Sequence, residues 1–515
     1  MAKTITTDIL ICGAGAAGLT LAIDLARRGV AFRLIDKSPA PFAGSRGKGI
    51  QPRSQEVFEE LGLVDRLFAT GGKYPPQRVH KPDGTFEDEN GFEATAPTPA
   101  EPYQAPLMVP QFLTEAVLRE RLAELGHRPE FGNELVAFTQ DKHGVTAKVV
   151  GAKGKQTIHA SYLVGADGGR SFVRHALGID FPGKTLGVRA IVADMFVDGV
   201  SCDAWHRWSE GASGQISLCP LAGTDMMQLQ GPVPAEGDID VSAQGLNALL
   251  AERTGRKDIV VRSVSWASVY TMNARLAERY RVGRAFLIGD AAHIHPPTGG
   301  QGLNTSVQDA YNLGWKIAAV LQGAPESLLA TYEEERRPVA AEMLGLATGL
   351  LEAAKQGSMR RGREVHQLDI GYPQSSLRFE APQRSGGVLA GDRAPDAPVR
   401  GAAGLPTRLF ELFQGPHWTL LGYGVDRLAG VAPRAGLHIH AVGPRGDITD
   451  EEGHFRAAYG VSTGDWVLVR PDGYVGGIVS SANVPALETY LENVGLTREN
   501  ASSVRRGWFG SRRAQ

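Results

Sequence analysis

The segment from Gly289 to Asn304, GDAAHIHPPTGGQGLN, contains residue types that could bind a metal ion. His293 and His295 are two residues apart and could share one face of a strand. Pro296 and Pro297 follow directly and end that strand, and the segment has no HExxH helix and no cysteine partner. The spacing therefore disfavours a metal site, and we expect none.

The same segment suits an anionic group better. Asp290 ends a short apolar run that is typical of a buried strand, and a helix is expected to begin near Leu303. Three glycines between them leave backbone N–H groups bare at the helix start, which is a favourable place for negative charge. These glycines are Gly299, Gly300 and Gly302.

A second glycine cluster, GAGAAG at Gly13–Gly18, matches GxGxxG in a strand–turn–helix context, with Asp36 at the end of the next strand. In such a unit Gly13 makes the tight turn, Gly15 admits a pyrophosphate and Gly18 allows helix and strand to pack. Asp36 can accept hydrogen bonds from a ribose. The alternative is a glycine-rich turn that binds nothing.

A third feature, YLVGADGGRS at 162–171, places Asp167 after a short apolar strand. Taken alone it is an ordinary strand followed by a turn.

The elements that position these residues fall into successive groups. Helices are predicted in SQEVFEELGLVDRLFAT and LTEAVLRERLAELG, and from about Val188 several strands indicate a largely antiparallel inserted sheet. RAFLIGDAAH then returns to a strand followed by a helix. Residues 371–407 read as a linker or the start of a domain, and the strands beyond include a hairpin turn at Asp472-Gly473.

Composition limits the class of protein. The 515 residues suggest two to four domains, and a net charge of -2 gives no sign of nucleic-acid binding. Three scattered cysteines favour a reducing compartment, and no apolar run is long enough for a membrane span. We expect a cytoplasmic protein, and the sequence leaves a homo-oligomer open.

Together the three motifs, in this order, resemble the FAD-dependent aromatic hydroxylases, single-component flavoprotein monooxygenases that include para-hydroxybenzoate hydroxylase, phenol hydroxylase and the polyketide hydroxylases. The segments GAGAAG, GADGGRS and GRAFLIGDAAHIHPPTGGQGLN carry the resemblance, which covers about residues 5–345.

The resemblance implies an α/β fold in three parts. We expect a Rossmann-like FAD-binding domain (1–180 and 273–370), an inserted, mostly antiparallel substrate-binding sheet (181–272) and a thioredoxin-like C-terminal domain (385–515). The C-terminal domain has no cysteine, so dithiol chemistry is excluded there and a structural or oligomeric role remains.

The resemblance also assigns cofactor contacts. Asp290 is expected on the ribityl chain of FAD, the backbone from Gly300 through Gly302 and Leu303 to Asn304 beside the flavin ring, and Arg46 on the phosphates. Gln111 is expected to touch the flavin, and Leu135 to contact adenine through its backbone. The other expected FAD contacts are Gly13, Gly15, Ala16, Ala17, Gly18, Asp36, Lys37 and Asp167.

Substrate residues are less well defined by the sequence. Gln215, Gln228 and Tyr270 are candidates on the inserted sheet, although packing within the sheet explains them equally well, and Pro297 is expected to place its carbonyl beside the substrate. No arginine is obviously placed for a substrate carboxylate, which favours a neutral phenol, hydroxypyridine or polyketide.

The implied chemistry belongs to the cofactor, and no protein residue is assigned a catalytic role. NADPH or NADH would reduce FAD, and reduced flavin with O2 would form a C4a-hydroperoxide that hydroxylates a small aromatic substrate. With only one dinucleotide fingerprint, NAD(P)H is expected as a transient co-substrate. Open alternatives are an epoxidase, a hydride-transfer reductase or a non-catalytic FAD-binding regulator.

Overall fold

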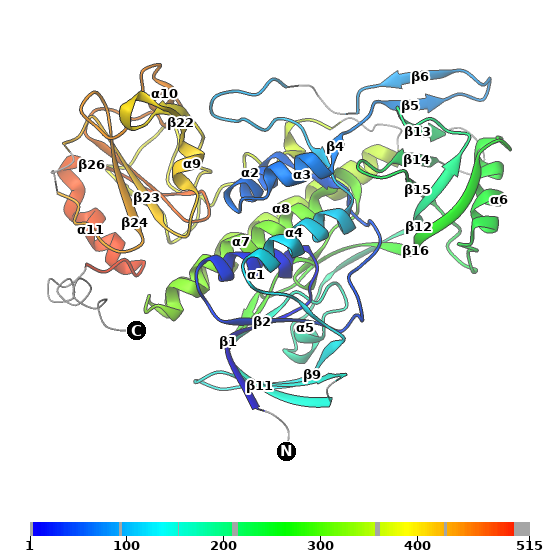
Figure 1. Cartoon of the computed structure of the whole chain (residues 1–515), viewed down its shortest axis with the longest axis horizontal. Coiled ribbons are helices and arrows are strands. Elements are labelled where there is room, and N and C mark those ends of the chain that lie inside the picture. Colours follow the sequence, from blue (N-terminus) through cyan, green and yellow to red (C-terminus); the bar gives the residue numbers. More distant parts are fainter. Residues whose placement is uncertain are drawn as a thin grey trace, which may run out of the picture. The chain divides into compact units, whose positions relative to one another are not determined.

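The computed structural model describes residues 4–91, 95–152, 154–208, 215–355, 361–426 and 430–498. The chain forms a mixed α/β fold with several sheets (Figure 1). It divides into two compact units: the first comprises residues up to 96, 103–311 and 336–368, and the second comprises 97–102, 312–335 and those from 369 onward. No helix in the described ranges is both long and apolar enough to cross a membrane.

A largely parallel sheet forms the centre of the first unit. β1 lies between β2 and β11, and β18 continues the sheet beyond β11, all in parallel. The central strand is fully buried at Ile9, Leu10 and Ile11, as its unbroken apolar run predicts. The strands of this sheet are β1 (Thr4–Cys12), β2 (Phe32–Asp36), β8 (Glu130–Phe131), β9 (Asn133–Gln140), β10 (Val145–Gly151), β11 (Gly154–Gly165), β17 (Arg281–Val282) and β18 (Ala285–Leu287).

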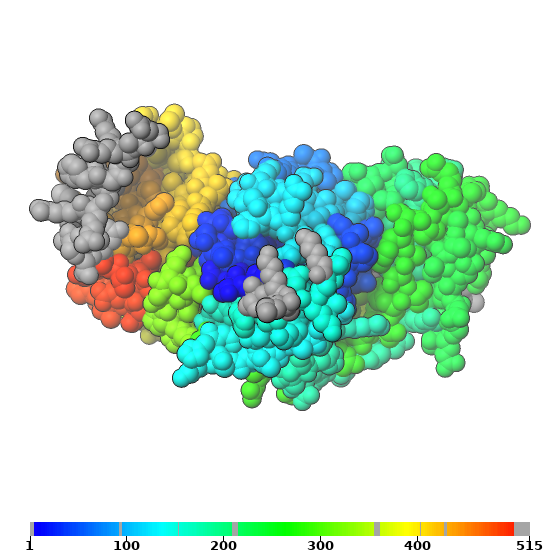
Figure 2. Space-filling view, turned by 60° about the horizontal axis from the view of Figure 1, so that its bottom comes forward, coloured from blue at the N-terminus to red at the C-terminus, as the bar shows by residue number. Residues whose placement is uncertain are grey.

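The connection between β1 and β2 is the predicted helix, α1 (Ala16–Arg27), which packs beside α4 (Gln111–Glu124). The dark blue surface of the first residues accordingly adjoins the cyan surface of the segment that holds α4 and β9–β11 (Figure 2). Because parallel strands end at one edge of a sheet, the turns after β1, β2, β11 and β18 converge there.

The second sheet of this unit is mostly antiparallel, in the order β19-β16-β12-β15-β14-β13-β5-β6. One face packs on α6 (Ala243–Thr254) through an apolar cluster that includes Ile191, Leu218, Leu229 and Leu246. Its strands are β5 (Gln77–His80), β6 (Phe86–Glu89), β12 (Gly183–Asp198), β13 (Trp205–Trp208), β14 (Ile216–Pro220), β15 (Met227–Pro232), β16 (Val260–Leu276) and β19 (His293–Ile294).

This sheet is larger than the predicted insertion at 181–272. β5 and β6 join it at one edge and β19 at the other, so three strands come from stretches expected in the FAD-binding domain. The polar sequence of β6, FEDE, carries no apolar alternation because the strand is exposed on both faces. A sequence pattern therefore could not reveal it.

The helices of the first unit differ from expectation at three points. Gly62, with φ +72°, divides the predicted helix at 54–70 into two, and the helix after the glycine loop begins at Gln301. The long helix α8 (Ala330–Lys355) was not predicted, and Pro338 lies inside it. The other α-helices in this part of the chain are α2 (Pro52–Glu60), α3 (Val64–Thr70), α5 (Phe172–Ala176) and α7 (Gln301–Leu321). A small three-stranded sheet contains β3 (Gly49–Ile50), β4 (Gly72–Lys73) and β7 (Leu107–Met108).

The second unit contains a five-stranded sheet in the order β20-β26-β25-β23-β24. The predicted hairpin is present, with Gly473 at φ +74° in the turn between β25 and β26. Residues 394–397 are buried, which favours the start of a domain over a linker for this part of 371–407. The elements are β20 (Phe379–Ala381), β21 (Pro398–Arg400), β22 (Pro406–Arg408), β23 (Trp418–Tyr423), β24 (Leu437–Val442), β25 (Asp465–Val469), β26 (Val475–Ser480), α9 (Leu409–Phe413), α10 (His454–Tyr459) and α11 (Val484–Asn493).

Residues 312–335, which the sequence placed in the FAD-binding domain, group with the second unit. Trp315 and Leu328 share an apolar cluster with Trp418, Leu420 and Trp466. Packing of the C-terminal part of α7 into this cluster therefore sets the boundary between the two units within the helix. This boundary could not be predicted from the local sequence of the helix.

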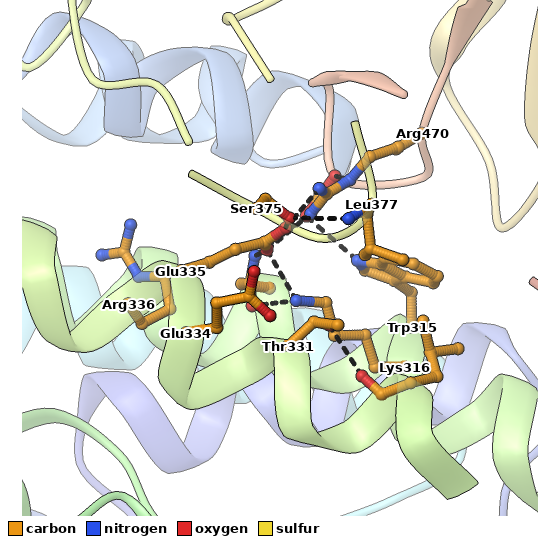
Figure 3. Close-up of polar contacts among 12 residues, drawn as sticks. Trp315, Lys316, Thr331, Glu334, Glu335, Arg336, Ser375, Leu377 and Arg470 are labelled. Atoms are coloured by element: carbon orange, nitrogen blue, oxygen red, sulfur yellow. Dashed lines mark hydrogen bonds and ion pairs between the residues drawn. The ribbon is translucent and has the colours of Figure 1, made fainter. Parts of the chain in front are cut away.

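A fully buried ionic network centres on Glu335 in this unit (Figure 3). Arg470 forms two hydrogen bonds with Glu335, of 2.6 and 2.9 Å, and two more with Asp472. Lys316 donates to Glu335 at 2.6 Å. Burial lowers the pKa of Lys316 to about 8, against the opposing effect of Glu335. The positive charges of Lys316 and Arg470 balance the negative charges of Glu335 and Asp472. Removal of any one of these four groups would therefore leave an uncompensated charge in the interior.

Replacing Arg470 with Met is expected to destabilise the second unit by about 3–5 kcal/mol, because it leaves two carboxylates buried beside one cation. Urea unfolding followed by tryptophan fluorescence measures this loss, since Trp315, Trp418 and Trp466 lie in that unit's core. The control is Arg400→Met, which breaks an exposed pair with Glu451 and should change stability by less than about 1 kcal/mol. Equal effects of the two substitutions would contradict the expectation.

Candidate cofactor and substrate site

The three glycines of the first cluster have different surroundings. A Cβ at Gly13 (φ +110°) would lie 2.1 Å from the Ala166 oxygen, and one at Gly18 would lie 1.9 Å from the Gly13 oxygen. A Cβ at Gly15 would meet nothing closer than Glu115 Oε1 at 3.7 Å. Packing therefore requires Gly13 and Gly18, whereas Gly15 leaves open space at the start of α1.

Asp36 fixes the turn that carries these glycines. Its Oδ2 accepts a hydrogen bond from the Ala14 N–H and its Oδ1 accepts one from the Ser38 N–H, both at 2.8 Å. A carboxylate can accept about four hydrogen bonds, so Asp36 retains capacity for ribose hydroxyls. Lys37 is exposed beside it, and Ala16 and Ala17 form the first turn of α1.

Asp167 follows β11 at the same edge of the sheet. Its Oδ2 accepts from the Val173 N–H at 3.1 Å, while its buried Oδ1 has no hydrogen-bond partner among the described residues. An unpartnered buried acceptor of this kind can take a hydrogen bond from a ligand or a water molecule. Leu135 is buried in β9, where it pairs with Val149, so only its backbone could reach an adenine.

Asp290 lies in the turn after β18, and its side chain is exposed to solvent. Crowding by protein atoms nevertheless raises the pKa of Asp290, against the lowering effects of His293 and Arg46.

The two histidines of the segment have structural surroundings. His293 is buried, and its Nε2 lies 2.6 Å from Asp309 Oδ2, while Arg336 donates to the other oxygen of Asp309 at 2.8 Å. Burial of His295, and its nearness to His293, lower the pKa of His295 to about 3. Within the described ranges no group of three or more His, Cys, Asp or Glu residues could hold a metal ion.

The glycine loop before α7 is held by hydrogen bonds that involve Asn304 of α7 and the distant Gln51. Asn304 accepts from the Gln51 N–H at 2.8 Å and donates to the Gly300 and Gly49 oxygens. The Asn304 side chain is thereby fully engaged within the protein, and only its backbone could face a flavin. The Gly300 N–H is not bare as expected, because it donates to the Pro297 oxygen at 3.3 Å.

Gly302 leaves open space at the start of α7. A Cβ there would meet only His295 Nδ1, at 3.9 Å. Leu303 is half-buried beside it, and Pro297 is exposed at the other end of the loop. The first backbone N–H groups of α7 have no partner within the helix, as is general for a helix N-terminus.

Arg46 belongs to a loop that is held from two sides. Gln111 accepts a hydrogen bond from the Arg46 N–H at 3.2 Å, and the Gln111 N–H donates to Gly47. On the other side, a Cβ at Gly44 would lie 2.1 Å from the ring of Trp266 on β16. The guanidinium of Arg46 is exposed, 5.1 Å from the centre of the Phe42 ring.

The three candidate residues of the second sheet lie toward the face opposite α6. Tyr270 is half-buried, and burial raises its pKa to about 12. Gln215 is half-buried, and its amide oxygen can accept from Arg207 at 2.9 and 3.1 Å. Gln228 is buried and donates to Ser45 and Asp194, so its amide is engaged within the protein.

Sequence reasoning missed two buried cations on this face. Lys48 donates to Gln228 Oε1 at 2.7 Å and lies 4.6 Å from the centre of the Trp205 ring. Arg207 is 4% exposed and donates to Gln77 at 2.7 Å. The sequence alone did not single out Arg207, which is engaged with Gln77 and Gln215 within the protein. These contacts join residues far apart in sequence, and no local signal could have revealed them.

Two family models match the chain. The model described as FAD binding domain matches residues 6–347, and the model described as aromatic-ring hydroxylase, C-terminal, matches residues 388–495.

Similar proteins include a flavin-dependent monooxygenase of Mycobacteroides abscessus, 42% identical over 94% of this chain and 99% of that protein. The 6-methylpretetramide 4-monooxygenase of Streptomyces rimosus is 33% identical over 96% and 95% of the two chains. Among solved structures, an aklavinone-11 hydroxylase in complex with FAD and aklavinone has a TM-score of 0.79 and 28% identity, covering 95% of this chain and 98% of its own.

The glycines allow folding and flavin binding to be separated. Gly15→Val and Gly302→Val are expected to leave the thermal unfolding temperature nearly unchanged and to weaken FAD binding at least tenfold, about 1.4 kcal/mol, because each side chain fills an opening. FAD release on dilution, followed by flavin fluorescence, measures this effect. Gly18→Val is the contrasting variant and should lower stability itself. Tight flavin binding by Gly302→Val would show that the opening is not the flavin site.

Proposed function

The chain belongs to the family of FAD-dependent aromatic-ring hydroxylases, and from this we propose that it hydroxylates an electron-rich aromatic substrate with FAD, NAD(P)H and O2. One observation supports this most directly. The turns after four parallel strands meet at one edge of the sheet, and Gly15, Asp36, Asp167 and Asp290 lie at or beside these turns. A mostly antiparallel sheet with a polar, aromatic face belongs to the same unit.

The residues present fit FAD. Gly15 and the first turn of α1 would take the pyrophosphate, Asp36 the adenosine ribose, and Asp290 the ribityl chain. The orphaned Asp167 oxygen and the open space at Gly302 are consistent with a large ligand that completes the site. When bound and reduced by NAD(P)H, FAD supplies activated oxygen: one atom enters the substrate and the other leaves as water.

The protein's own task is to orient the substrate and limit access of water. Trp205 and Trp266 are half-buried aromatic side chains of this sheet, and Lys48 and Arg207 are buried cations beside them. These groups suit a multi-ring substrate with several oxygen substituents. The named substrates of similar proteins, 6-methylpretetramide and aklavinone, support a polyketide of this class.

The C-terminal sheet is proposed to be a thioredoxin-like domain with a supporting role. Its order, β24-β23-β25-β26 with β23 and β24 parallel and β25 and β26 antiparallel, is consistent with that fold. The last cysteine of the chain is Cys219, so the domain has no thiol for redox chemistry.

Purified protein is expected to be yellow and to oxidise NAD(P)H faster when a hydroxylated anthraquinone or tetracycline precursor is present. Mass spectrometry under 18O2 should show one labelled oxygen in the product, because the oxygen comes from O2 and not from water. EDTA should have no effect. An unlabelled product, or a flavin that no aromatic compound influences, would favour the reductase or non-catalytic alternatives.

Substitution of Lys48 by Met is expected to raise KM for the aromatic substrate severalfold without loss of bound FAD. The ammonium lies among Gln228, Trp205 and Asp194 of the second sheet and not on the glycine loops. Steady-state kinetics together with flavin absorbance measure both quantities. Lys73→Met, an exposed change on β4, serves as the control. Loss of FAD from Lys48→Met would assign the residue to the cofactor site instead.

A further inference from the structure

A buried carboxyl group lies beside the proposed pyrophosphate site. Glu115, on α4, is 1% exposed, and its Oε1 lies 3.7 Å from the position that a Cβ on Gly15 would occupy. Gln111 donates to this oxygen at 2.8 Å. The group therefore lies where the first turn of α1 is open to a ligand.

The charges around Glu115 do not neutralise it well. Arg119, on the same helix, is the nearest cation, with its Nη1 3.9 Å from Oε2, and Glu120 is exposed one residue further on. From the neighbouring elements, Asp36 adds negative charge and the Ala16 N–H at the start of α1 adds a positive dipole. Burial, reinforced by Asp36, raises the pKa of Glu115 despite Gln111, Arg119 and Ala16.

Binding of FAD would add two negative charges to this environment. The phosphates of a pyrophosphate diester are ionised at all ordinary pH values, so the cofactor itself cannot take up the compensating proton. An anion and a buried carboxylate that share one helix start repel each other, and protonation of the carboxyl group removes that repulsion.

We propose that Glu115 is the proton-linked partner of FAD: the pyrophosphate docks at the start of α1 as Glu115 takes up one proton from solvent. Neutral Glu115 can still accept from Gln111, whose own oxygen accepts from the Arg46 N–H. The Glu115–Gln111–Arg46 chain therefore joins the pyrophosphate site to the loop that carries Arg46. This inference rests on FAD binding and does not depend on which substrate is hydroxylated.

The sign of the pH dependence follows from linkage. A complex that holds one more proton than its free components is favoured at low pH, so FAD should bind more tightly as pH falls. The affinity of wild-type protein should decrease with pH by up to about tenfold per unit within the linked range. An unperturbed glutamic acid would be ionised throughout a scan from about pH 5.5 to 8.5 and would give no slope.

The test compares Glu115→Gln with wild type in the full-length protein. Glutamine keeps an oxygen acceptor for Gln111 and has no titratable proton, so FAD affinity should become independent of pH to within about twofold and equal that of wild type at low pH. Dilution of the flavin-loaded protein, with released FAD followed by fluorescence, gives the affinity at each pH. Glu120→Gln, an exposed change on the same helix, should retain the wild-type slope.

Direct proton counting provides a second measurement. Calorimetric titration of flavin-free protein with FAD, in two buffers of different ionisation enthalpy, should show net proton uptake by wild type and Glu120→Gln but not by Glu115→Gln. Equal uptake by all three proteins, or weaker FAD binding by Glu115→Gln at every pH, would overturn the proposal. If wild type binds no FAD at all, the flavoprotein assignment fails first, which is a separate outcome.

Discussion

The parallel alignment of β1, β2, β11 and β18 is the constraint on which the site depends. Each strand ends at the same edge, so turns that are more than 270 residues apart in sequence face one opening. Gly13 and Gly18 maintain this geometry because neither position has room for a Cβ. Without their close approach to neighbouring backbone, α1 could not start where it does, and its N–H groups would point elsewhere.

The two faces of the second sheet differ in polarity. Its α6 face is an ordinary apolar core, whereas its other face combines tryptophans, amides and two buried cations. Buried polar groups on a sheet are costly unless each has a partner, and here Gln228 and Gln77 provide that partnership internally. The polar groups of this face are therefore already paired within the protein.

The sequence predicted those elements that are marked by a short motif of neighbouring residues. GAGAAG, the strand before Asp290 and the Asp472-Gly473 turn each combine a short spacing with one required backbone geometry, and the first sheet followed from them. Long-range partnerships could not be predicted in this way. Nothing in the sequence near Lys48 points to Gln228, 180 residues away, and nothing near Gly300 points to Gln51. The same limit applies to β6, whose polar residues give no pattern, and to α8, which contains a proline.

The division of α7 between the two units limits how C-terminal domains can be exchanged between related proteins. The first turn of this helix faces the proposed flavin opening, and its last turns contribute Trp315 to the core of the second unit. A C-terminal domain transferred from a relative with its boundary near residue 385 would arrive without Trp315, Lys316 and Glu335, and so without part of its own interior. Recombination, in nature or in the laboratory, therefore has to move residues 312–335 together with the C-terminal sheet, or to choose partners whose helices already match.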